Sequence, residues 1–356
     1  MPGIMQQGKG RRITRPAFAA PMHSQARVML GLSVLLLGVN WPVMKLGLDY
    51  FSPFWMVCLR FLLSAPAVAA LIVISRRRLP VLTRADVPVI LGVAAFQFAG
   101  MMGLATLALT LVPAGTASIL IYTTPVWLLL IDMILGEAKI IRKRKATALV
   151  SAAGCAVIVF SPGKSGMWGA LLLILVASAL WAIAMRLVNR HKWQGSVRDA
   201  LFWQMLIAGL ALLPVAYFTE GPFAPRSLTP VSVTLLVLIG PVASGAGFGF
   251  MIAAGRSLPA ARVALISTAT PLIGFLSATL ALGEPVQAAT LIGGGVMLAA
   301  LVRGGVQTVT PGATAEGAGH RPQTTWHRPK ACGPHIPETP RKRPNSTRTP
   351  PQRPFP

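Results

Sequence analysis

Ten apolar runs follow one another along most of the chain, separated by short polar segments. A membrane-crossing helix needs about 20 mainly apolar residues for a hydrocarbon core of about 30 Å. The pattern therefore predicts an all-α membrane protein with ten transmembrane helices, of which the fifth is short. The expected helices cover residues 28–47, 54–75, 87–109, 114–135, 146–161, 168–188, 198–218, 231–253, 262–282 and 287–303.

Composition supports this interpretation and changes how the charge is understood. Hydrophobic residues make up 54% of the 356 residues and charged residues only 12%. Soluble domains carry about 25% charged residues, so most of this surface does not face water. The net charge of +24 is concentrated in the termini and in loops between apolar runs. We therefore expect no nucleic-acid partner.

The distribution of Lys and Arg predicts the orientation. With the N-terminus inside, the inner loops 75–84, 139–145, 186–198 and 255–262 hold fifteen basic residues, and the outer loops hold only Lys45, Lys164 and Arg226. Basic residues are enriched in cytoplasmic loops. Both termini are therefore expected in the cytoplasm, with the chain in a bacterial-type inner membrane.

The two ends of the chain differ from its middle. Residues 1–27 carry five basic residues and no acid, and no small-residue cleavage site follows the first apolar run, "GVNWPVMKLG". We interpret them as a basic cytoplasmic segment before an uncleaved first helix. Residues 304–356 are rich in Pro and Arg, which predicts a disordered basic tail. Contact of this tail with anionic lipid head groups is the alternative.

The two halves of the chain resemble each other weakly but in the same order. An offset of 146 residues pairs Pro113, Ala114, Thr124 and Pro125 with Pro259, Ala260, Thr270 and Pro271. An offset of 148 pairs Phe54, Trp55 and Pro66 with Phe202, Trp203 and Pro214. Two five-helix repeats, 28–161 and 168–303, explain this order. Because five is odd, the second repeat enters the membrane from the opposite side, as in many secondary transporters.

Pro125 and Pro271 occupy matching places within apolar runs. Proline removes a helix hydrogen bond, and a freed carbonyl in lipid is tolerable only where it faces protein or a water-filled cavity. The pair therefore predicts broken helices that face inward, although a simple packing kink would also explain each proline.

Three stretches resemble EamA-type members of the drug/metabolite transporter superfamily. They are "GVNWPVMKLGLDYFSPFWMVCLRFLLSA" (38–65), "LVPAGTASILIYTTPVWLLLIDMILGE" (111–137) and "LPAARVALISTATPLIGFLSATLALGE" (258–284). The resemblance covers residues 28–303 and implies a ten-helix, exporter-like fold with a central cavity. The family's substrates include amino acids, other metabolites and toxic compounds. One departure is that Asn40 and Pro42 flank Trp41 where many relatives have Gly or Ser.

Polar and aromatic residues inside the runs are the candidates for lining a substrate cavity. They are Trp41, Arg60, Gln97, Tyr122, Thr123, Thr124, Pro125, Trp181, Thr268, Thr270 and Pro271. Arg60 lies about seven residues into its run, or roughly 10 Å deep. It could bind an anionic group of the substrate, or it could snorkel outward or cap helix-end carbonyls. The tryptophans could equally belong to the interfacial belt, and the hydroxyls could bond back to their own helices.

The sequence contains no motif typical of metal binding, nucleotide binding or catalysis. All five histidines fall in termini or loops, the three cysteines lie far apart, and no P-loop occurs. We therefore expect no metal, no cofactor and no enzymatic activity. Asp132 is expected to pair with the basic cluster 139–145, which leaves the coupling ion open.

These observations predict a secondary transporter that exports small organic metabolites, amino-acid-like or drug-like, by alternating access. The alternative is a non-transporting membrane protein, either a sensor or a lipid-modifying enzyme. The expected partners are a small-molecule substrate and the lipid bilayer, and a homodimer is compatible with the sequence.

Overall fold

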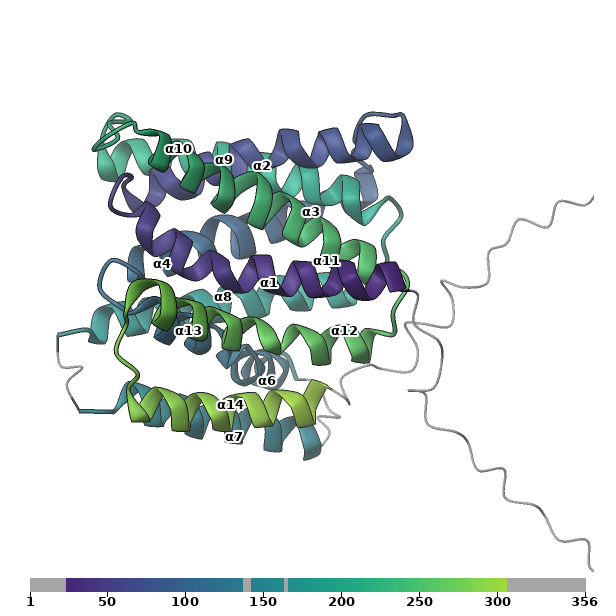
Figure 1. Cartoon of the computed structure of the whole chain (residues 1–356). Helices are drawn as coiled ribbons and strands as arrows, with labels where there is room; N and C mark the ends of the chain where they lie inside the picture. The colour runs from purple at the N-terminus through teal and green to yellow at the C-terminus, as the bar shows by residue number, and fades with distance from the viewer. Residues whose placement is uncertain (1–23, 137–141, 163–165, 306–356) are drawn as a thin grey trace, which may run out of the picture. The chain divides into compact units, whose positions relative to one another are not determined.

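The computed structural model describes residues 24–136, 142–162 and 166–305, and within these ranges the chain is helical with no β-strand. Most of the segment 1–27, most of the tail 304–356, and Glu137 lie outside the described residues. The helices lie side by side, and the start of α1 and the end of α14 are at the same end of the bundle (Figure 1). The elements are α1 (Ser24–Gly47), α2 (Pro53–Arg76), η2 (Arg84–Asp86), α3 (Val87–Val93), η3 (Ala94–Met101), α4 (Met102–Ala108), α5 (Ala114–Leu120), η4 (Ile121–Thr123), α6 (Thr124–Ile134), α7 (Arg142–Val159), α8 (Trp168–Arg190), α9 (Val197–Glu220), α10 (Pro230–Val237), η5 (Leu238–Ala246), α11 (Gly247–Gly255), α12 (Ala260–Ser267), α13 (Ala269–Leu282) and α14 (Ala288–Gly305).

Eight helical stretches are long and apolar enough to cross a membrane. They correspond to eight of the ten expected helices, and they make the chain an integral membrane protein. The fifth and tenth expected helices are present as α7 and α14. Neither is among the eight, because α7 begins with the charged sequence Arg-Lys-Arg-Lys and the apolar part of α14 is short, Ala288–Arg303.

Two of the eight stretches are broken at the places that the prolines indicate. Between α5 and α6, Tyr122 leaves the helical conformation with φ −84° and ψ 16°, and Pro125 lies in the first turn of α6. Between α12 and α13 the break falls at Thr268, three residues before Pro271. The helices are therefore interrupted near both prolines, at Tyr122 by a non-helical residue and at Thr268 by a turn whose φ of −66° and ψ of −14° remain in the right-handed helical region.

Two further stretches contain wide, π-helical turns. These are η3, between α3 and α4, and η5, between α10 and α11. Pro241 lies inside η5, which accounts for the disturbed hydrogen bonding there. The segment η3 has no proline, so its wide turn could not be predicted from residue type.

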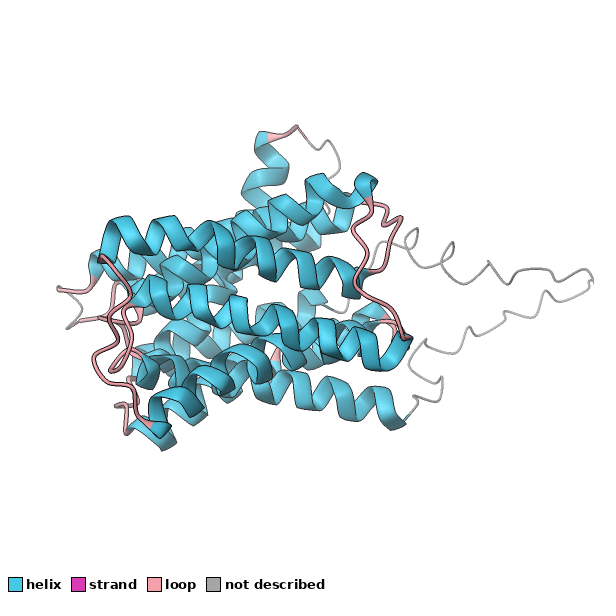
Figure 2. Cartoon of the chain, turned by 90° about the horizontal axis from the view of Figure 1, so that it is seen from above, coloured by secondary structure: helices cyan, strands magenta, loops and turns pink. Residues whose placement is uncertain are grey.

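Helices that are distant in sequence form the main contacts of the bundle. The chief pairs are α2 with α9, α7 with α14, and α1 with both α11 and α13; Figure 2 shows the layers from above. The α7–α14 pair is closest at Gly154 and Gly293, where a β-carbon added to Gly154 would lie only 2.5 Å from the carbonyl oxygen of Gly293. Small residues let membrane helices approach this closely, so dispersion contacts hold the pair together.

Two glutamates tie the second half of the chain to the first by capping helix N-termini. Glu220 accepts hydrogen bonds from the backbone N–H groups of Phe54 and Trp55, at 2.9 and 3.0 Å, at the start of α2. Glu284 accepts from those of Ala114 and Gly115, at 2.6 and 2.9 Å, at the start of α5. A carboxylate here satisfies unpaired donors and interacts favourably with the helix dipole.

Candidate functional site

Arg60 of α2 is fully buried within the bundle. Its Nε donates to the Ser244 hydroxyl at 2.6 Å, its Nη1 lies 3.0 Å from the Met44 sulfur, and its guanidinium carbon lies 5.4 Å from the Phe61 ring centroid. The Nη2 group has no hydrogen-bond partner, and among the described residues no carboxylate pairs with this arginine. The expectation that Arg60 might snorkel outward or cap helix-end carbonyls is therefore wrong.

Lys45, at the end of α1, caps helix-end carbonyls in place of Arg60. Its Nζ donates to the carbonyl oxygens of Leu109 and Val112. Those carbonyls follow the last helical residue of α4, where the chain has unpaired acceptors.

Asn40 and Arg60 both contact the sulfur of Met44. Its Nδ2 donates to the Met44 sulfur at 3.0 Å, while its buried Oδ1 has no partner. The environment of Met44 thus contains one unpaired guanidinium donor and one unpaired amide acceptor. Unpaired buried polar groups cost about 1–3 kcal/mol each.

The two helix breaks meet through Tyr122. Its hydroxyl faces the Thr270 side chain beside the second break, and its ring packs edge-to-face on Trp181 with centroids 5.3 Å apart. The structure therefore brings together three predicted residues from α8, α13 and the first break.

The hydroxyls near the breaks mostly satisfy the local backbone. Thr124 and Ser178 both donate to the carbonyl oxygen of Ile121, at 3.0 and 2.8 Å, and Thr123 donates to Ser178 at 3.0 Å. Thr268 donates to the carbonyl of Leu265 in its own helix at 2.6 Å. Most of these hydroxyls therefore bond to backbone carbonyls, as the alternative to lining a substrate cavity predicted.

The remaining predicted residues lie around these two groups. Trp41 is buried and packs closely on α13. A β-carbon added to Gly274 of that helix would lie 3.1 Å from the Trp41 ring. Pro271 is buried and its carbonyl accepts from Ser118 at 3.3 Å. Gln97 lies half-buried in η3, and Pro125 is half-buried in α6. None of the eleven lines the two cavities, of about 540 and 300 Å³, that open elsewhere on the bundle.

Met44, Ser178 and Ser244 contact the candidate residues but were not predicted from the sequence. Ser178 precedes Trp181 by three residues, so helix periodicity places both on one face. Ser244 lies in the Gly-rich run of η5, where its hydroxyl also donates to the Ile239 carbonyl at 2.8 Å. That contact spans five residues, so an α-helical pattern could not reveal it.

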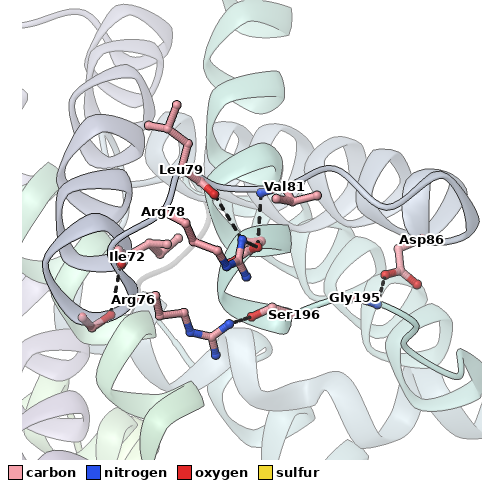
Figure 3. Close-up of polar contacts among 10 residues, drawn as sticks. Ile72, Arg76, Arg78, Leu79, Val81, Asp86, Gly195 and Ser196 are labelled. Carbon is pink, nitrogen blue, oxygen red and sulfur yellow. Dashed lines mark hydrogen bonds and ion pairs between the residues drawn. The ribbon is translucent and has the colours of Figure 1, made fainter.

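A polar clasp, formed by loop residues 76–86 and the segment 191–199, joins the two halves at one end of the bundle. Asp86 accepts from the backbone of Gly195 at 2.7 Å and contacts His191 Nε2 at 2.7 Å. Arg78 forms an ion pair with Asp199 at 2.7 Å, and Arg76 donates to Ser196 at 3.1 Å (Figure 3). Asp86 and Asp199 are both buried, so these contacts hold the two segments together at this end of the bundle.

Asp132 pairs with Arg144 at 3.3 Å and with Arg186 at 3.1 Å. The expected partnership with the basic cluster 139–145 is therefore confirmed through Arg144. Across the described part of the chain, no group of three or more His, Cys, Asp or Glu side chains is arranged to hold a metal ion.

Comparison with known proteins agrees with this architecture. A "Probable amino-acid metabolite efflux pump" of Salmonella typhimurium is 26% identical over 274 residues, which is 74% of this chain and 88% of the relative. An uncharacterized transporter of Bacillus subtilis is 26% identical over 280 residues, 76% of this chain and 88% of the relative. A crystal structure with 18% sequence identity and a TM-score of 0.54 covers 80% of this chain and 96% of its own, which supports the fold alone.

The sequence model of the EamA-like transporter family matches this chain twice, over residues 26–160 and over residues 167–302. These two matches cover most of the chain and both groups of candidate residues. The chain therefore belongs to the EamA-like transporter family, within the drug/metabolite transporter superfamily.

Proposed function

We propose that this protein exports small organic metabolites, amino-acid-like compounds among them, across a bacterial inner membrane. The observation that carries the proposal is the buried Arg60, which has no counter-ion in the described chain and one unpaired nitrogen. A charged side chain at this depth is costly, and such residues generally serve transport or binding. An anionic group of the substrate would complete it.

The polar environment of Met44 suits a zwitterion. A substrate carboxylate would accept hydrogen bonds from Arg60, and a substrate ammonium would donate to the unpaired Oδ1 of Asn40. Two relatives, from Salmonella typhimurium and Escherichia coli, carry names that refer to amino-acid metabolites. We propose the same substrate class for this chain.

Ten membrane-spanning helices in two inverted repeats, 28–161 and 168–303, would provide the moving parts. The helix contacts support this arrangement because they mirror one another when the halves are exchanged. The pair α1–α11 corresponds to α8–α4, and α1–α13 corresponds to α8–α6. The pairs α2–α9 and α7–α14 each correspond to themselves. The two helix breaks and the two π-helical turns also fall in corresponding stretches.

Alternating access would then open one end of the bundle while the other stays closed. The polar clasp of Asp86, Arg78 and Asp199 would close the cytoplasmic end, and the Glu220 and Glu284 caps would join the halves at the outer end. Release of one set with retention of the other would expose Arg60 to one side at a time.

Reconstitution into liposomes tests transport directly. Purified protein in liposomes should give saturable uptake of at least one compound from a panel of labelled amino acids and their derivatives. Protein-free liposomes provide the baseline. A non-transporting sensor or a lipid-modifying enzyme would give the baseline rate for the whole panel, and the enzyme would in addition alter the liposome lipids.

Cysteine accessibility tests the inverted repeat. In a variant whose Cys58, Cys155 and Cys332 are replaced by alanine, Val286→Cys should react with a membrane-impermeant maleimide in intact cells. Arg142→Cys should react only after permeabilisation, because five helices separate the matching loops. Both native positions are exposed. Labelling of both variants from the same side would rule out the inverted arrangement.

A further inference from the structure

The guanidinium of Arg60 is held by two elements that lie far apart in the sequence, α1 and η5. Its Nε donates a hydrogen bond to the Ser244 hydroxyl of η5 at 2.6 Å, and its Nη1 donates to the Met44 sulfur of α1 at 3.0 Å. A thioether sulfur is a weak acceptor, whereas a hydrogen bond from a charged donor to an oxygen is short and strong. Ser244, which is fully buried, is therefore the main contact that fixes the charged group.

The wide turn of η5 leaves the Ser244 hydroxyl free to accept from Arg60. Ser244 donates its own proton to the carbonyl oxygen of Ile239, five residues earlier, at 2.8 Å. A hydroxyl has one proton and two lone pairs, so its oxygen still accepts the Nε hydrogen bond of Arg60. In a regular α-helix a serine hydroxyl bonds to the carbonyl four residues earlier, which here belongs to Gly240. The π-helical turn therefore directs this hydroxyl, and such turns occur frequently at functional sites.

The backbone of Arg60 is held separately from its side chain. A β-carbon added to Gly240 would lie 2.9 Å from the Arg60 carbonyl oxygen, so η5 packs directly on α2 here. The Ser64 hydroxyl, one turn further along α2, donates to the same carbonyl oxygen at 2.6 Å. Ser64 and Ser244 are thus two buried serines that bond to one arginine, the first at its backbone and the second at its guanidinium.

The contact with Ser244 determines which edge of the guanidinium can bind a substrate. A carboxylate binds arginine through two parallel hydrogen bonds along one edge of the fork. Because Nε is bonded to Ser244, the edge available to a carboxylate is formed by Nη1, which has a second proton, and by Nη2, which has no partner. We propose that Ser244 is a positioning residue, which holds Arg60 so that this edge binds the substrate carboxylate. The inference rests on the proposed function, in which Arg60 binds the substrate.

Transport kinetics in liposomes test this role on the full chain. The probe is the labelled amino acid that gives the fastest saturable uptake in the liposome panel, and each rate is divided by the amount of folded protein. Ser244→Ala should raise the KM about tenfold, because a loosely held guanidinium binds the carboxylate less well, and should change the maximal rate by no more than about twofold. Ser64→Ala is the matched control. It removes a buried hydroxyl that bonds to the backbone of Arg60, and it should leave the KM unchanged.

A double-mutant cycle separates positioning from a structural role. In the Arg60→Met background, Ser244→Ala should not lower the transport rate further, because no guanidinium is left to position. An unchanged KM in Ser244→Ala, an equal rise in Ser64→Ala, or an equal loss from Ser244→Ala with and without Arg60 would each overturn the inference. The two proposals fail in different ways, since Arg60→Met tests substrate binding by Arg60 and Ser244→Ala tests only how Arg60 is held.

Discussion

Arg60→Met is expected to leave the protein folded and to lower its transport rate by about ten- to a hundredfold. That range corresponds to the loss of one hydrogen bond from a charged group, at about 1.5–3 kcal/mol. Folding should survive because no carboxylate in the described chain pairs with Arg60, so its removal leaves no partner charge unpaired. Replacing a buried charge with an apolar side chain of similar volume is often neutral or stabilising.

The matched control is Lys45→Met, which removes a cation that has carbonyl partners. This variant should melt at a lower temperature while each folded molecule transports normally. Transport in liposomes and thermal unfolding in detergent, measured on both variants, separate the two roles. Normal transport by Arg60→Met, or its failure to fold, would show that Arg60 serves the structure and not the substrate.

Gly293→Ala is expected to destabilise the protein through the contact between α7 and α14. The added methyl group would collide with the carbonyl oxygen of Gly154 and would lie 2.6 Å from the side chain of Ile158. A backbone carbonyl cannot rotate away, so the two helices must separate. Overpacking of this kind costs about 1–3 kcal/mol, which a lower melting temperature in detergent would reveal.

Gly295→Ala provides the comparison on the same helix. Nothing lies within 4 Å of a β-carbon at Gly295, and both substitutions gain the same helix propensity of about 1 kcal/mol. The difference between the two variants therefore isolates helix packing. Equal melting temperatures would mean that α7 and α14 do not depend on their close approach at Gly293.

Residue patterns predicted the helices and their breaks well, because both follow from local chemistry. Apolar length locates each helix, and the matching places of Pro125 and Pro271 in the two halves located the interruptions. Proline alone was not sufficient, because Pro42, Pro66 and Pro214 lie inside continuous helices. The pairing of Asp132 with the basic cluster was also predictable, since opposite charges at neighbouring helix ends lie close in space. Apolar length alone does not predict whether α7 and α14 cross the membrane, because their apolar stretches are short.

Contacts between distant segments could not be predicted in this way. Glu220 and Glu284 cap helices more than 160 residues away. The residues around each glutamate do not indicate which helix it caps. The Arg60 site depends on Met44 and on Ser244, which come from α1 and η5. The position of Arg60 along its helix indicated that its charge would cost free energy within the membrane. Only tertiary packing shows that the side chain is enclosed and does not reach the surface.

Extracellular metabolites provide the most direct test of export. Cells that overproduce this protein, its Arg60→Met variant, or neither would be compared by untargeted mass spectrometry of the medium, with equal amounts of both proteins in the membrane. We predict that at least one small compound, bearing a carboxylate or another anionic group, accumulates outside only when the intact protein is present. Identical media from all three cultures, or accumulation of the compound inside the cells, would contradict the proposed export function.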